Sequence, residues 1–251
     1  MADLDGDGKA DILWEHTDGR VAAWLMDGTT LKSAATLLPA GTGWQLNLAT
    51  DFDGDGKADI LWQHDDGKAD ILWQHDDGTP AIWLMNGTTV VGGSRLFGAG
   101  TGWTATLTAD FDGDGRDDIV WAHPDGRVAI WLMNGTTATA AKVIRAAGST
   151  DTPVAAGAIA MRGSSDLVWR KADGSLAYSL MSATNETSQG VVLAPGYTFI
   201  RLADFSSIGN RAVLAQKADG TVVIAKWYGS SFASTTILTA GTGYTPARLP
   251  D

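Results

Sequence analysis

Short segments in which apolar and polar residues alternate recur along the chain, and turns rich in Gly, Asn and Asp separate them. Alternation with a period of two is typical of β-strands that have one face toward a core. In the middle of the chain it predicts strands over Ala105–Phe111, Asp118–Ala122, Arg127–Met133 and Thr139–Ala146. The 31 Gly and 11 Trp residues fit tight turns between short, aromatic-rich strands, so we expect an all-β protein.

The strand pattern returns in several copies, each of which starts at a glycine-rich turn. An acidic turn and the following strand begin at Asp3 (DLDGDGKADILWEH), Asp51 (DFDGDGKADILWQH) and Asp110 (DFDGDGRDDIVWAH). The phrases WLM and GTGW follow in the same order in the first two copies, and two weaker copies surround Asp166 and Ala212. We therefore expect a single domain over 1–251 with repeat units at approximately 1–50, 51–109, 110–160, 161–203 and 204–251.

The repeat length indicates how the units assemble. Four antiparallel strands in roughly 48 residues is the size of one β-propeller blade, and such blades must stack around an axis to cover both faces of each sheet. The last segment, GTGYTPARLPD, resembles the one that precedes an acidic turn elsewhere, so it can complete the first blade. We predict a β-propeller of four-stranded antiparallel blades, about five per chain, closed by strands from both termini. The alternative is a piece of a larger ring.

One blade carries a tandem duplication. The segment Gly56–Asp66 (GKADILWQHDD) is repeated letter for letter at Gly67–Asp77, and Pro80 follows, which removes a donor from the sheet. One extra strand would reverse the direction of everything after it. We therefore predict a perturbed second blade in which one copy occupies the second-strand position and the other is displaced. Exchange of a strand with another chain, or an incomplete ring, would give a homo-oligomer.

Composition and charge remove several classes of function. The chain has 18 Lys and Arg residues against 29 Asp and Glu, a net charge of −11, which argues against nucleic acid and an anionic membrane surface as partners. No apolar stretch has the length of a membrane span, so we expect none. The absence of Cys excludes disulfides, thiolate metal sites and a cysteine nucleophile. The first residues are no signal peptide, so any export signal would lie outside this sequence.

The three acidic turns have the spacing DxDxDGxxD, which favours a metal ion. It offers side-chain oxygens at positions 1, 3, 5 and 9 and a backbone carbonyl at position 7, and hard oxygen ligands on a flexible loop favour calcium. Four carboxylates in one small volume would repel one another without a cation. The predicted calcium ligands, with the carbonyl group at the Lys or Arg, are Asp3, Asp5, Asp7, Lys9 and Asp11; Asp51, Asp53, Asp55, Lys57 and Asp59; and Asp110, Asp112, Asp114, Arg116 and Asp118.

The last two units lack most of this pattern. The fourth keeps Asp166 at position 9, and the fifth has Asp204 and Ser206 but Ile208 and Ala212 where carboxylates would stand. The turn before the second copy of the duplicated segment has Trp62 at its first ligand position, so it is no calcium loop either. We therefore expect three calcium ions per chain.

The phrases DFDGDGKADILW, AIWLMNGTT and GTGW resemble the FG-GAP or VCBS-type repeats of bacterial secreted proteins. Those repeats are similar to the calcium-binding blades of integrin α-chains and of integrin-like fungal lectins. The resemblance covers nearly the entire chain, strongly in the first three units. It implies a propeller with calcium loops at the residues named above and an extracellular, secreted protein. Integrin-type propellers usually have seven blades, whereas this chain has material for five.

No catalytic constellation emerges, so we expect a binding module rather than an enzyme. Aromatic residues recur at the GTGW position, at Trp44, Trp103, Tyr197 and Tyr244, and exposed rings beside polar groups would suit a sugar. Trp24, Trp83 and Trp131 at the WLM position are expected to pack between blades. Carbohydrate binding is the leading hypothesis. The alternatives are an adhesion scaffold for a protein ligand, and an engineered or fragmentary repeat assembly with no ligand beyond calcium.

Overall fold

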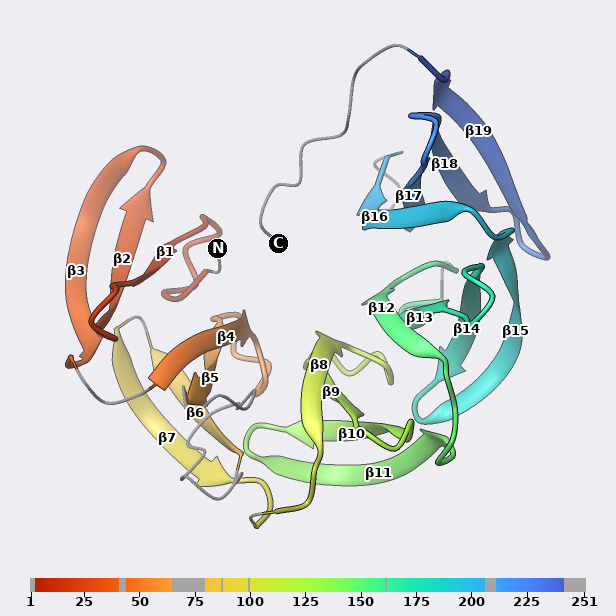
Figure 1. The fold of residues 1–251 in the computed structure, drawn as a ribbon. Helices are drawn as coiled ribbons and strands as arrows, with labels where there is room; N and C mark the ends of the chain where they lie inside the picture. The colour runs from red at the N-terminus through yellow and green to blue at the C-terminus, as the bar shows by residue number, and fades with distance from the viewer. Residues whose placement is uncertain are drawn as a thin grey trace. The chain divides into compact units, whose positions relative to one another are not determined.

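The computed structural model describes residues 3–40, 44–64, 80–86, 88–98, 100–160, 162–205 and 211–241, and for residues 44–48 and 59–64 it describes the backbone alone. These residues form strands and turns, and no helix among them could cross a membrane. The strands form five antiparallel sheets in which sequence neighbours pair (Figure 1). The predicted all-β fold of four-stranded antiparallel sheets is confirmed.

The first two sheets belong to the N-terminal part of the chain. The first contains three strands within the described residues, in the order β1 (Ile12–Glu15), β2 (Val21–Asp27) and β3 (Thr30–Leu38). The second has the order β4 (Trp44–Thr50), β5 (Asp59–His64), β6 (Ala81–Asn86) and β7 (Thr89–Arg95).

The third sheet is the one whose strands were predicted individually. It contains β8 (Thr104–Ala109), β9 (Asp118–Ala122), β10 (Val128–Asn134) and β11 (Thr137–Arg145). The observed ends differ from the predicted ones by no more than about two residues, the usual uncertainty of a strand end read from sequence.

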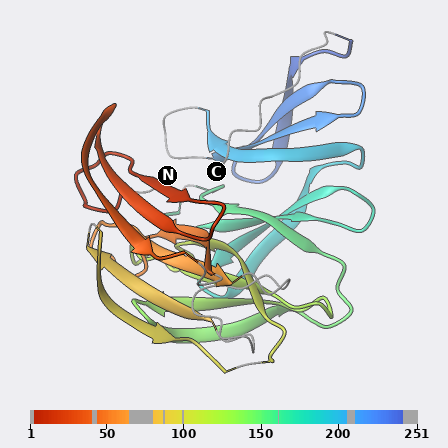
Figure 2. The ribbon, with the colours of Figure 1, turned by 60° about the vertical axis from the view of Figure 1, so that its left-hand side comes forward.

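The fourth and fifth sheets repeat this up-and-down order. They consist of β12 (Thr152–Gly157), β13 (Asp166–Arg170), β14 (Leu176–Ser182) and β15 (Asn185–Leu193), then β16 (Tyr197–Asp204), β17 (Arg211–Lys217), β18 (Val222–Trp227) and β19 (Phe232–Leu238). Figure 2 shows the strands of the fifth sheet, in blue, side by side and twisted. The right-handed twist of L-residue strands accounts for this shape.

The chain divides into two compact units. The first comprises Met1–Ala105, Gly115–Pro124 and Trp131–Ala141, and the second comprises Thr106–Asp114, Asp125–Ile130 and Lys142–Asp251. In the second unit, strand β12 lies beside β16 and β15 beside β19, so the fourth and fifth sheets stack with equivalent strands together. Their shared core includes Val168, Leu180, Val213 and Val223.

Burial changes in a regular way from strand to strand. Strands β9 and β13 are buried on both faces, and their runs of Ile, Val, Leu and Trp explain this. The last strand of each sheet, such as β11 with the sequence TATAAKVIR, is mostly exposed. Sheets that are covered on both faces while their outer strand faces solvent are what stacked blades require.

The first copy of the duplicated segment forms β5. It pairs with β4 from Trp44↔His64 to Thr50↔Asp59 and with β6 at Ile60↔Trp83, so one copy does occupy the second-strand position. The second copy, Gly67–Asp77, lies outside the described residues. So does most of the terminal segment GTGYTPARLPD that would complete the first sheet. The single domain, the five-blade count and ring closure by both termini therefore stay predictions.

Candidate metal centre

Two glycines in each acidic turn make the loop possible. In the first turn Gly6 and Gly8 have φ angles of 78° and 79°, and Gly54, Gly56, Gly113 and Gly115 repeat this at 80°, 82°, 81° and 86°. Only glycine adopts this left-handed region without a steric penalty. The N–H groups of Gly6 and Gly8 then donate to the two carboxylate oxygens of Asp3, at 2.7 and 2.8 Å. The DGDG spacing therefore fixes the loop around its first aspartate.

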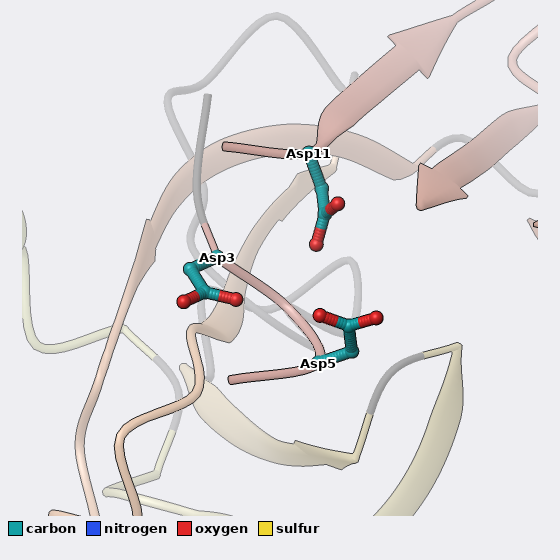
Figure 3. A group of neighbouring side chains, drawn as sticks. All are labelled: Asp3, Asp5 and Asp11. Carbon is teal, nitrogen blue, oxygen red and sulfur yellow. The ribbon is translucent and has the colours of Figure 1, made fainter. Parts of the chain in front are cut away.

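The first turn brings three of its four predicted carboxylates together. Oxygen atoms of Asp3, Asp5 and Asp11 lie within 4.8 Å of one another, and Figure 3 shows the three groups facing a common space. Asp11 is fully buried and accepts hydrogen bonds from the N–H groups of Leu4 and Met26, both at 2.8 Å. The bond from Met26 ties the ninth position of the loop to strand β2, and the bond from Leu4 ties it to the start of the loop.

The fourth predicted carboxylate of this turn, Asp7, is held by lysine. The ammonium group of Lys32, on β3, lies 2.7 Å from Asp5 Oδ2 and 2.8 Å from Asp7 Oδ2. The hydrogen bond from Lys32 lowers the pKa of Asp7, and the two carboxylates raise the pKa of Lys32. A side-chain cation on β3 thus neutralises part of the first turn.

The second turn repeats the geometry with a different third member. Oxygen atoms of Asp51, Asp53 and Asp55 lie within 4.8 Å of one another. Asp51 accepts the N–H groups of Gly54 and Gly56 at 2.6 and 2.9 Å, as Asp3 does in the first turn. A hydrogen bond from Lys57 at 2.8 Å lowers the pKa of Asp55. The side chain of Asp59 lies outside the described residues.

The residues of the third acidic turn are divided between the two compact units of the chain. Asp110, Asp112 and Asp114 belong to the second unit, where Asp110 Oδ1 accepts the N–H of Gly113 at 2.6 Å. Burial, followed by the charge of Asp114, raises the pKa of Asp112. Asp118 belongs to the first unit, is fully buried and accepts the N–H of Met133 at 2.9 Å, as Asp11 does from Met26. Arg116, in the first unit, hydrogen bonds to the carbonyl of Asp53 at 3.0 Å.

Successive acidic turns are joined by one repeated backbone hydrogen bond. The N–H of Ala58 donates to the carbonyl of Asp3 at 2.5 Å, and that of Asp117 to Asp51 at 2.8 Å. In the second unit the N–H of Ser165 donates to the carbonyl of Asp110 at 2.6 Å. The first aspartate of each turn is therefore linked to the start of the next repeat. The positions of the Lys9, Lys57 and Arg116 carbonyl groups as metal ligands stay a prediction.

The fourth turn contains an internal cation. The guanidinium group of Arg162 lies 2.5 Å from Asp166 Oδ1, and Asp166 is fully buried. Asp166 also accepts the N–H groups of Ile159, Ala160 and Met181, at 3.1, 3.0 and 2.9 Å. The loss of acidic residues in this turn was predicted from the sequence, whereas the pairing of Arg162 with Asp166 was not. The sequence did contain a signal for this pair. Arg162 stands in the fourth turn, in which Asp166 is the only aspartate of the acidic pattern that remains. In the fifth turn, Ser206 and Ile208 lie outside the described residues.

The aromatic positions fall into two groups. At the GTGW position, Trp103 is half-buried with its ring centroid 5.2 Å from that of His123, and half-buried Tyr197 lies 4.9 Å from Lys217 Nζ. The Trp44 side chain and Tyr244 lie outside the described residues. At the WLM position, Trp24 packs against Trp14 at 5.1 Å and Trp131 against Trp121 at 5.4 Å. Trp24 and Trp131 therefore each pack against a tryptophan of the neighbouring strand in their own sheet, and Trp131 also lies 5.3 Å from Phe97, which follows strand β7 of the second sheet.

The repeats and their turns can be compared with known families. The family model described as FG-GAP-like repeat matches residues 3–62, 65–121 and 110–169. The chain belongs to the FG-GAP-like repeat family. The resemblance inferred from the sequence phrases is thereby confirmed. The matches end at residue 169, so the fifth repeat and most of the fourth lie beyond them.

Two solved structures are similar to this chain. The FG-GAP chain is similar to the C-terminal WD40 domain of Sif2, with 14% identity, a TM-score of 0.45, and coverage of 90% of this chain and 54% of that one. A chain of the mitotic checkpoint complex has 12% identity, a TM-score of 0.45, and coverage of 96% and 80%. The FG-GAP chain thus spans about half the length of the Sif2 chain. No curated protein matches it.

Proposed function

We propose that the chain is a secreted, non-catalytic binding module whose acidic turns hold calcium and whose ligand is a carbohydrate. The observation that carries the calcium part is the convergence of carboxylate oxygens within 4.8 Å in the first turn, at Asp3, Asp5 and Asp11, and in the second, at Asp51, Asp53 and Asp55.

The donor set fits calcium. Every converging group is a carboxylate on a glycine-rich loop, and calcium accepts six to eight such oxygens in flexible geometry. Magnesium requires a tighter octahedron, and zinc or copper prefer nitrogen or sulfur ligands. Burial, followed by the charges of Asp114 and Asp110, raises the pKa of Asp112, and a divalent cation would offset both effects. Loops of this kind reach millimolar-range affinity in extracellular modules, which suits a secreted protein.

Calcium removal tests this part of the proposal. Saturating calcium is expected to raise the melting temperature above its value in excess chelator, because an ion that binds only the folded state stabilises it. At a hundredfold excess over the dissociation constant the gain is about 2.7 kcal/mol per site, or roughly 5–10 °C for a chain of this size. Asp173→Asn, which removes an exposed acid outside the acidic turns, should leave the calcium-dependent shift unchanged. A melting temperature that is the same with calcium and with chelator would contradict the proposal.

Carbohydrate is the ligand class that the aromatic positions favour. Trp103 beside His123 places a half-buried ring next to a polar group. Sugars present an apolar face and a polar rim, so a ring with a hydrogen-bonding neighbour suits them. A glycan array in calcium buffer tests the ligand class, and binding to at least one glycan is expected.

A protein ligand is the second candidate, and one observation favours it. The outer strands β7, β11, β15 and β19 expose aliphatic side chains, among them Val91, Val143, Val191 and Ile237, which are 60%, 48%, 62% and 54% exposed. Exposed apolar groups that recur on equivalent strands could contact a protein partner.

A further inference from the structure

A cluster of aromatic residues in one repeat is replaced by polar residues at the equivalent positions of the next repeat. In the first unit, the ring centroid of Phe97 lies 4.9 Å from that of Trp121 and 5.3 Å from that of Trp131, and Trp103 lies beside His123. Alignment of FGAGTGW with RAAGSTD, of VWAH with VWRK and of WLM with SLM places polar residues at four of these five positions one repeat later. They are Arg145 for Phe97, Asp151 for Trp103, Lys171 for His123 and Ser179 for Trp131.

In the second unit these residues form a polar network around the one retained indole. The guanidinium of Arg145 lies 4.2 Å from the ring centroid of Trp169, and its Nε donates to Asp151 at 3.0 Å. Lys171 Nζ donates to the same Asp151 oxygen at 2.6 Å. Arg145 also pairs with Glu186 at 2.9 Å, and the hydroxyl of Ser179 donates to Glu186 at 2.6 Å. The network thus replaces aromatic packing with partly buried ion pairs.

Stability alone does not account for this exchange. Partly buried ion pairs rarely stabilise a protein more than the hydrophobic groups they replace, because charges lose hydration when they leave water. A cavity of about 510 Å³ lies beside this network, over β13, β14 and β15 of the fourth sheet, and its lining includes Arg145, Thr150, Asp151, Lys171, Asp173 and Gln189. This volume is within the range of small-ligand sites.

The lining indicates what the cavity would take. Arg145 and Lys171 bring positive charges to it, Asp151 and Asp173 bring negative ones, and most of these groups already neutralise one another. Hydrogen bonds from Ser175 lower the pKa of Asp173, so this carboxylate remains an acceptor. A charge-balanced wall gives an ion no net attraction, whereas hydroxyl groups both donate to carboxylates and accept from ammonium and amide groups. We infer that this cavity of the fourth repeat is the binding site for a neutral saccharide, an inference that rests on the proposed carbohydrate function.

The chain supplies a matched control for the test. The sequence KADG occurs at Lys171–Gly174 and again at Lys217–Gly220, and both lysines neighbour the residue at the GTGW position, Asp151 or Tyr197. Only Lys171 lines the cavity. Lys171→Met and Lys217→Met therefore remove the same group from equivalent turns.

The experiment uses the full chain in calcium buffer on an array of neutral, sialylated and sulfated glycans. The wild type and Lys217→Met are expected to bind the same neutral glycans, and Lys171→Met to bind them at least tenfold more weakly, since a hydrogen bond to a charged group is lost. Gln189→Ala, at an exposed lining residue, should also weaken binding. Melting temperatures of all variants control for folding.

Each contrary outcome has a distinct meaning. Binding of neutral glycans that neither Lys171→Met nor Gln189→Ala reduces would overturn the assignment to this cavity and leave the carbohydrate function standing. Binding of sialylated or sulfated glycans alone would overturn the charge-balance argument. No binding by the wild type to any glycan would overturn the carbohydrate function itself and the site with it.

Discussion

Asp11 and Asp166 both stand at the ninth position of their turns, but the groups around them differ in charge. Each is fully buried and accepts the backbone N–H of the methionine that ends the WLM or SLM phrase, Met26 or Met181. Around Asp11 the loop supplies Asp3 and Asp5, whereas around Asp166 it supplies Arg162. A buried carboxylate needs a compensating positive charge, which comes from a bound ion in the first case, on our proposal, and from the chain itself in the second.

Arg162 should therefore contribute to stability in a calcium-independent way. Arg162→Met leaves Asp166 buried with backbone donors alone, and the expected loss is about 2 kcal/mol, a value reduced because the guanidinium is partly exposed. Urea denaturation with and without calcium measures it. The loss should be the same in both conditions. Arg127→Met, which breaks an exposed pair with Asp125, is the control and should cost less than about 1 kcal/mol. An Arg162→Met variant as stable as the wild type would contradict the role.

At the scale of elements, the strands and the carboxylate cluster of the first turn could be predicted from the sequence, because both depend on local residue patterns. Strands such as Asp118–Ala122 were found because alternation, turn glycines and repetition all agreed at those positions. The Asp3, Asp5 and Asp11 cluster followed from spacing alone. Three features could not be read from local pattern. They are the bridging of Asp5 and Asp7 by Lys32, the pairing of Arg162 with Asp166, and the hydrogen bond from Ala58 to Asp3, because each depends on which distant side chain or strand the fold brings near.

The duplicated segment leads to a prediction about which copy the fold needs. Strand β5 comes from the first copy and pairs along its whole length with β4. Deletion of Gly67–Asp77 would leave HDDGTPAIWLM, which matches HPDGRVAIWLM of the next repeat in length and turn residues. The deletion variant is expected to fold with a melting temperature equal to or above that of the wild type. Thermal denaturation followed by circular dichroism measures this, and failure of the variant to fold would show that the second copy is needed.

At the scale of the whole molecule, the acidic turns connect each repeat to the next. The carbonyl groups of Asp3, Asp51 and Asp110 each accept a hydrogen bond from the following repeat, so an ion that orders one turn also orders its neighbour. This arrangement relates the net charge of −11 to the fold, because bound calcium would offset the repulsion of the clustered aspartates.

Calcium stoichiometry is the most direct test of the central claim, that the acidic turns are metal sites. Isothermal titration of the full chain should give three ions for the wild type and two for Asp53→Asn, which removes one of the converging oxygens of the second turn. Absence of calcium binding, or a stoichiometry that Asp53→Asn leaves unchanged, would contradict the account.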